Sequence, residues 1–101
     1  MTDEIHAEVR RAIAVAMVAL APDVVRVTYT IGEDWHGDPA IYFRMVLADQ
    51  ATEGARLLQS INRVQDRLQG ELQPYEKWGL WPYFNCRSQS EQNRMRCKEW
   101  E

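Results

Sequence analysis

The residues best suited to chemistry gather in one short stretch, residues 33–38, which reads Glu-Asp-Trp-His-Gly-Asp. Carboxylate oxygens bind hard cations, and an imidazole beside carboxylates suits a transition metal. The same groups can carry protons in acid-base catalysis if the fold holds them rigidly and shifts their pKa. However, the spacing matches no recognised metal pattern, such as the twelve-residue calcium loop, and no second segment offers obvious ligands. We therefore expect no metal and no cofactor here, and we interpret the stretch as an exposed, polar hairpin tip.

Other catalytic arrangements find no support in the residue order. Nucleotidyl transfer needs paired carboxylates near a Gly-Ser turn, whereas Asp38 is followed by Pro-Ala-Ile with no second acid. Ser88, Cys86 and His36 have the residue types of a nucleophilic set, but no nucleophile elbow surrounds them. The five glycines are scattered, so no phosphate-binding loop is present. The sequence thus predicts a protein that is not an enzyme.

Tryptophan in the acidic tip indicates binding, because a large apolar ring among charges needs something to cover it. One interpretation is that Trp35 folds back onto the sheet edge or onto Trp78 and Trp81. The other is that Trp35 anchors a partner, since tryptophan, tyrosine and arginine dominate binding hot spots. We predict two partner-binding patches: Glu33, Asp34, Trp35, His36 and Asp38 in the first, and Trp78, Trp81 and Arg87 in the second.

Hydrophobic periodicity predicts the elements that position these residues. Residues 1–21 form an amphipathic helix, with apolar side chains at spacings of three and four. Residues 23–48 form a strand, a loop and a second strand, because apolar and polar residues alternate on both sides of the tip. Residues 50–72 form a second helix that Asp49 or Thr52 caps, and its buried stripe includes Leu58.

The remaining part, residues 81–101, predicts an edge strand and a C-terminal helix. Pro82 cannot donate a ladder hydrogen bond, which favours the sheet edge. Ser88 and Glu91 have capping-box spacing, so the last helix is expected to begin at Ser88 and to reach Trp100. The whole predicts a single α+β domain with the order α-β-β-α-β-α. Its three-stranded sheet, antiparallel or mixed, carries the helices on one face.

Composition limits the class of protein and its partners. The 101 residues suffice for one domain, the net charge is −3, and no apolar run is long enough to span a bilayer. We expect a cytoplasmic protein in which Cys86 and Cys97 are most simply free thiols, with an intramolecular disulfide between them as the alternative. The segment with Arg87, Arg94, Arg96 and Lys98 is locally basic, and is either a solvated helix surface or a contact for phosphate.

Two resemblances accompany these patterns. The predicted topology is similar to that of BolA-like and type II KH folds, although Gly70-Glu71-Leu72-Gln73 lacks the second glycine of a KH clamp. Residues 32–41 and 82–88 resemble segments of small uncharacterised bacterial proteins whose genes are paired with a toxin of the HEPN type. The latter resemblance covers about half of the chain and implies an antitoxin-like or regulatory subunit.

From these features we predict a small module that binds a protein partner, such as a basic toxin or RNase, by electrostatic complementarity. A homodimer is also left open. The alternative is a nucleic-acid-binding domain that uses the aromatic and basic C-terminal region, because bases stack on aromatic rings beside arginines.

Overall fold

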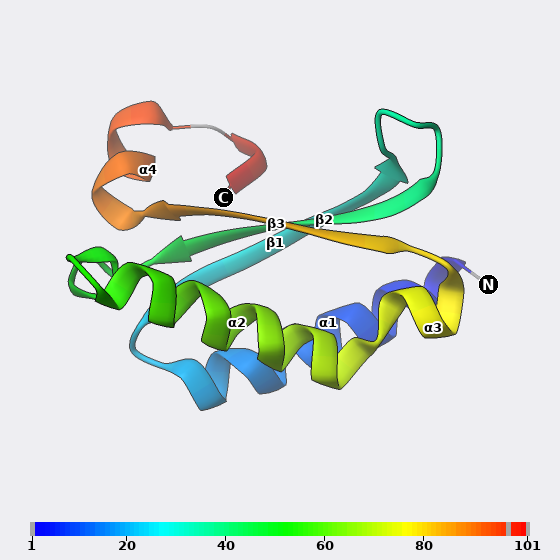
Figure 1. The fold of residues 1–101 in the computed structure, drawn as a ribbon, viewed down its shortest axis with the longest axis horizontal. Coiled ribbons are helices and arrows are strands. Elements are labelled where there is room, and N and C mark those ends of the chain that lie inside the picture. Colours follow the sequence, from blue (N-terminus) through cyan, green and yellow to red (C-terminus); the bar gives the residue numbers. More distant parts are fainter. Residues whose placement is uncertain (1, 97, 101) are drawn as a thin grey trace.

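The computed structural model describes residues 2–96 and 98–100 of the chain. The elements follow one another as α1 (Thr2–Leu20), β1 (Val24–Glu33), β2 (Pro39–Leu47), η1 (Asp49–Thr52), α2 (Arg56–Leu72), α3 (Pro74–Trp78), β3 (Trp81–Ser88), α4 (Gln89–Met95) and η2 (Lys98–Trp100). Figure 1 shows α1, α2 and α3 below a sheet, with α4 and η2 above it. The predicted α+β class and the order of its main helices and strands are confirmed.

The sheet is mixed and three-stranded, with the order β1-β2-β3. β1 and β2 form an antiparallel pair in which Tyr29 lies opposite Phe43. β3 returns parallel to β2, because η1, α2 and α3 form the crossover between them. The predicted edge position of the strand that carries Pro82 is therefore confirmed.

The core lies between the sheet and the two long helices, on what we call the helix face of the sheet. The stripe predicted for α1 is confirmed, since Val9, Ala12 and Ala16 are buried there. β2, the central strand, contributes Ile41, Phe43, Met45 and Leu47, all of them exposed by 1% or less. This alternation fixes β2 in register, because a slip of one residue would turn every apolar side chain to the opposite face.

The start of α2 differs from the prediction. Asp49 and Thr52 belong to η1, and α2 begins later, at Arg56, without a side-chain cap on its first turn. The Asp49 carboxylate accepts hydrogen bonds from Ser90 N and Ser90 Oγ instead, so it joins η1 to α4. Leu58 is 68% exposed, because the buried face of α2 carries Ser60, Val64 and Leu68 instead. Ser60 donates there to Ala51 O at 2.9 Å.

The helices do not all pack on one face, contrary to the prediction. Ser88 caps α4 with the expected capping box, but α4 ends at Met95, and η2 follows. Together they cover one end of the other face of the sheet, which we call the outer face. Trp100 is 8% exposed there, its carbonyl accepts from Arg26 Nε at 3.0 Å, and the strand residue Val46 is fully buried.

Candidate functional site

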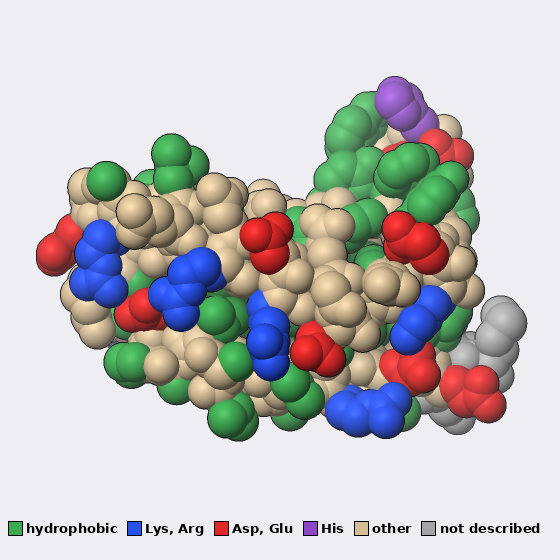
Figure 2. All heavy atoms as spheres, turned by 60° about the horizontal axis from the view of Figure 1, so that its bottom comes forward, with side chains coloured by type: hydrophobic (Ala, Val, Ile, Leu, Met, Phe, Trp, Pro, Cys, Tyr) green, Lys and Arg blue, Asp and Glu red, His purple; other side chains and the backbone are tan. Residues whose placement is uncertain are grey.

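The loop between β1 and β2 stands away from the rest of the molecule. We call residues 33–39 the tip. In Figure 1 the loop rises above the outer face at one end of the sheet, opposite the end that carries α4. Figure 2, a view with the helix side brought forward, shows a projection with hydrophobic, acidic and histidine side chains. The first predicted patch is thus one continuous, protruding segment.

A buried carboxylate organises the tip. Asp34 Oδ1 accepts from His36 N at 2.9 Å and from Asp38 N at 3.0 Å, while Asp34 N donates to Asp38 O at 2.9 Å. Gly37 completes the turn with a φ of 84°, a conformation that favours glycine. Asp34 is only 9% exposed, so the expectation of an exposed side chain is wrong at this position of the tip. Its carboxylate fixes the loop from within.

The tip is also joined to β3, through a residue that the sequence did not single out. Tyr83 OH donates to Asp34 Oδ2 at 2.9 Å. Burial raises the pKa of Asp34, but the hydrogen bonds from Asp38 N, Tyr83 OH and His36 N outweigh it and leave that pKa below its ordinary value. The same bond to Asp34 raises the pKa of Tyr83. The pair therefore holds an ionised carboxylate against a protonated phenol.

Trp35 remains 75% exposed. Its ring lies 5.4 Å from the Tyr83 ring and 5.4 Å from the His36 ring, so neither Trp78 nor Trp81 is the ring on which it rests. Tyr83 in turn stacks on Tyr42 at 5.3 Å, and Tyr42 OH donates to Glu33 O at 2.9 Å. Trp35, Tyr83 and Tyr42 form an aromatic row that runs from the tip onto the outer face.

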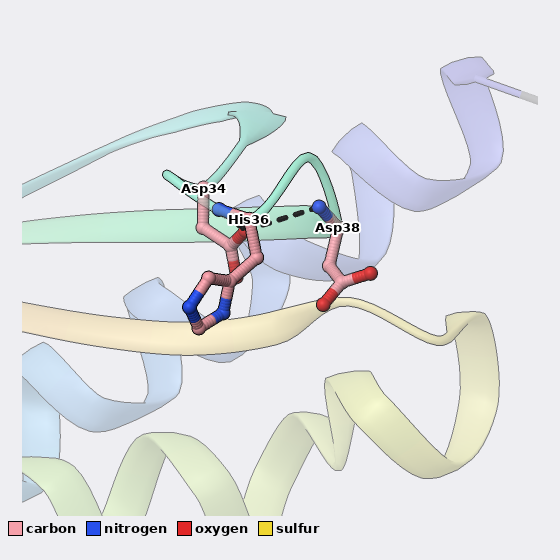
Figure 3. A group of neighbouring side chains, drawn as sticks. All are labelled: Asp34, His36 and Asp38. Atoms are coloured by element: carbon pink, nitrogen blue, oxygen red, sulfur yellow. Dashed lines mark hydrogen bonds between the residues drawn. The ribbon is translucent and has the colours of Figure 1, made fainter.

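Three side chains of the tip could reach one cation. Atoms of Asp34, His36 and Asp38 that can bind a metal lie within 4.8 Å of one another, and Figure 3 shows these side chains on the same turn. A carboxylate-imidazole-carboxylate set suits a divalent transition metal. Both Asp34 oxygens, however, already accept hydrogen bonds from the loop and from Tyr83, which leaves His36 and Asp38 as the exposed donors. The geometry is that of a turn held by the hydrogen bonds to Asp34.

The second predicted patch is not brought together. Trp78 packs partly against the core from α3, and Trp81 is 44% exposed beside Tyr75, with ring centres 4.2 Å apart. Arg87 lies six residues after Trp81 on β3, a separation of about 20 Å along a strand. Its guanidinium lies 4.2 Å from the centre of the Trp100 ring and donates to Gln92, so Arg87 anchors the C-terminal segment.

The basic C-terminal region contains an open pocket of about 470 Å³ lined by Arg26, Gln92, Asn93 and Arg96. It lies where β1 meets α4. The pocket and the aromatic row therefore occupy different ends of the molecule.

Cys86 is a free thiol whose pKa burial raises, in keeping with the prediction for this residue, and Cys97 lies outside the described residues.

Strand alternation alone could have placed Tyr42 and Tyr83 on the side of the sheet away from the helices. The register of β3 on β2 sets them side by side, since Tyr42 lies opposite Tyr83 in the parallel ladder. No sequence signal gives that register.

The described helices include none that is long and apolar enough to cross a membrane. Comparison of the chain with protein-family models, with curated proteins and with solved structures finds no match.

Proposed function

We propose that this chain is a non-catalytic, protein-binding module whose docking element is the tip. The observation that carries the proposal is a large aromatic ring that is 75% exposed and yet belongs to an ordered, internally bonded turn. Exposed apolar rings cost solubility, and tryptophan is among the residues that contribute most at interfaces. An exposed Trp35 on a fixed support is what a binding hot spot requires.

Preorganisation strengthens this argument. A loop that is already in its binding conformation loses little entropy when it docks, so more of the contact energy appears as affinity. Here the Asp34 carboxylate ties His36 and Asp38 into one turn, and Tyr83 both bonds to Asp34 and supports the Trp35 ring. The buried carboxylate of Asp34 holds the loop in its conformation, and the exposed side chains of the tip remain available to a partner.

The charge of the tip favours a basic partner. Glu33 and Asp38 are exposed, and neither forms an ion pair with the described residues. Acidic groups around an apolar anchor steer a basic surface toward it and suppress acidic competitors. As part of the proposal, the module acts in the bacterial cytoplasm as the antitoxin-like or regulatory subunit of a pair. Its basic partner, a toxin or RNase, would have its RNA-binding surface covered by the tip.

The test compares two tryptophan variants that differ in position. Tagged wild-type protein, Trp35→Ala and Trp81→Ala are used to capture partners from lysate of the native host, and captured proteins are identified by mass spectrometry. The partner found is then purified and titrated against all three proteins. We expect Trp35→Ala to weaken binding by about 30-fold or more, as for a hot-spot residue worth about 2 kcal/mol. The control, Trp81→Ala, should bind within about threefold of the wild type.

Circular dichroism shows whether each variant is folded before it is titrated. Equal affinity of a folded Trp35→Ala variant and the wild type would contradict the proposal. So would equal losses in Trp35→Ala and Trp81→Ala, because the tip would then have no special role. Weaker binding at high salt is expected as well, since the acidic rim acts through screened charges.

A second candidate function rests on the aromatic row. Stacked rings beside an arginine can hold the bases of a single-stranded nucleic acid, and Arg44 follows Tyr42 by two residues on the same face of β2. The acids of the tip oppose it, because they repel phosphate. Fluorescence anisotropy with short single-stranded RNA and DNA tests whether the protein binds nucleic acid. Binding weaker than about 10⁻⁴ M at physiological salt would be no more than non-specific contact and would end this alternative.

A further inference from the structure

The free edge of the sheet on β1 has backbone groups that point away from the molecule. Asp34 N donates to Asp38 O, and these residues continue the register of β1 on β2. In an antiparallel pair, residues that exchange hydrogen bonds with their opposite alternate with residues that do not. The even-numbered residues of β1 therefore direct their N–H and C=O groups to β2. The odd-numbered residues Val27, Tyr29 and Ile31 direct theirs outward.

These outward groups have no backbone partner among the described residues. The side chains on this strand give a second sign of an open edge. Ile41, Phe43 and Met45 on β2 are exposed by 1% or less, whereas their β1 neighbours on the same helix face, Val27, Tyr29 and Ile31, are all only half-buried. The apolar layer of the core thus reaches the edge of the sheet before it is fully covered.

β1 also lacks the features that usually protect an edge. Proteins block exposed edges with proline, with lysine, with inward-pointing charges or with very short strands. β1 has ten residues, no proline and no lysine, and its charged residues, Arg26 and Glu33, lie near its two ends. The irregularity between Val24 and Arg26 disturbs only the beginning of the strand. The central segment, residues 27–31, is therefore an unprotected template for another strand.

We propose that the occupant of this edge is β1 of a second copy, paired antiparallel about a two-fold axis at Tyr29. Hydrogen-bonded pairs must join two outward-pointing, odd-numbered residues, which restricts the choice of register. With Tyr29 opposite Tyr29, each Val27 faces Ile31 of the other copy. On the helix face, the two paired β1 strands then contribute only aromatic and β-branched pairs, which are favourable cross-strand neighbours.

The outer face accepts the same register. Thr28 lies opposite Thr30, and Arg26 lies opposite Gly32, so no like charges meet. If the register were shifted by two residues, Val27 would lie opposite Glu33, which would place an apolar side chain against a carboxylate. The chosen register therefore makes the strand self-complementary, which a dimer with two-fold symmetry requires. Two three-stranded sheets would become one continuous six-stranded sheet.

We expect this dimer to dissociate in the micromolar range. A strand pair with a few apolar contacts is smaller than the roughly 1,600 Å² that a standard stable interface buries. Sedimentation velocity of the full chain from about 1 μM to about 500 μM, which spans micromolar dissociation constants, should show conversion of monomer to dimer.

Amide hydrogen exchange followed by NMR at both ends of that range tests the register residue by residue. The amides of Val27, Tyr29 and Ile31 should exchange at least about tenfold more slowly in the concentrated sample, because dimerisation bonds them. The amides of Thr28 and Thr30 point toward β2 and should be protected equally in both samples. A dimer without this alternation would overturn the proposal, as would a monomer throughout the concentration range.

Two matched variants separate this edge from the rest of the molecule. Thr30→Lys adds a charge to β1, and Asn85→Lys adds the same charge to an exposed position on the opposite edge strand, β3. Thr30→Lys should raise the dissociation constant by about tenfold or more, since lysine on an edge opposes strand pairing. Asn85→Lys should leave it within about twofold. Equal effects of the two variants would contradict pairing through β1.

Discussion

The attachment of Trp100 to the outer face gives the sharpest stability prediction. Truncation of a buried aromatic side chain removes its hydrophobic contribution, and the loss scales with the area that folding hides from water. Trp100 is 8% exposed, its ring holds the Arg87 guanidinium, and the residue covers the end of the sheet where Val46 is buried. Trp35 is the same residue type at 75% exposure, so it provides an internal control.

The magnitudes follow from burial. A tryptophan side chain hides about 200 Å² when it is fully buried, and each square ångström contributes about 25 cal/mol. For Trp100→Ala, at 8% exposure, this gives about 4.6 kcal/mol, or about 3–4 kcal/mol after allowance for a compact unfolded chain. For Trp35→Ala the same reasoning gives about 1 kcal/mol. Since 1 kcal/mol shifts the Tm of a domain this size by about 4–8 °C, the two variants should differ by about 10 °C or more.

Urea unfolding followed by circular dichroism measures both variants, because this signal does not depend on tryptophan fluorescence. The m-values of the two variants and of the wild type should agree within error if each unfolds in one step. If Trp100→Ala proves no more destabilising than Trp35→Ala, then η2 does not pack on the outer face as described. In that case the covered end of the sheet would also need another explanation.

Three further predictions concern the interior and the tip. The pKa of Asp34 is lower in the folded protein than in the unfolded chain, so its ionised form stabilises the fold above about pH 4. This contribution is lost as the pH falls below that value. Urea unfolding across this range should show a steeper loss of stability for the wild type than for Asp34→Asn. Ser60→Ala should cost about 1–2 kcal/mol, because it leaves Ala51 O without a buried donor, whereas Thr52→Ala should cost less than about 0.5 kcal/mol; thermal unfolding compares the two, and a reversed order would contradict the assigned bonds. Elemental analysis of purified protein should find no stoichiometric metal, because the carboxylate oxygens of Asp34 serve the turn; one equivalent of metal that is lost in Asp34→Asn would show the opposite.

Several features of the fold were predictable because they depend on local patterns. The alternation in β1 and β2 and the apolar stripe of α1 each follow from the side-chain period of a strand or a helix. The capping box at Ser88 and the edge position of Pro82 depend on the hydrogen bonds of one or two residues, so they too could be read locally. The position of the tip between the two strands followed from the same alternation.

Features that depend on contacts between distant segments could not be predicted in this way. Asp49 was expected to cap α2, but a serine 41 residues later takes its carboxylate. Leu58 matched a helical stripe, yet the face of α2 that packs on the core is the one with Ser60 and Val64, so Leu58 lies in solvent. α4 and η2 lie on the outer face because Arg26 and Arg87 hold Trp100 there, and nothing in the local sequence of those three residues specifies the pairing.

The tip likewise combines features that follow from local sequence with features that follow from contacts between distant segments. Turn residues and strand alternation are local signals, so the order of the amino acids was enough to place acids, a histidine and a tryptophan in one turn between two strands. The role of each side chain depends instead on contacts that form when distant segments of the chain fold together. The parallel register of β3 on β2 brings Tyr83 to Asp34, which buries that carboxylate and supports the exposed ring of Trp35. A contact between residues 49 positions apart has no local signal, because it exists only after the sheet has formed.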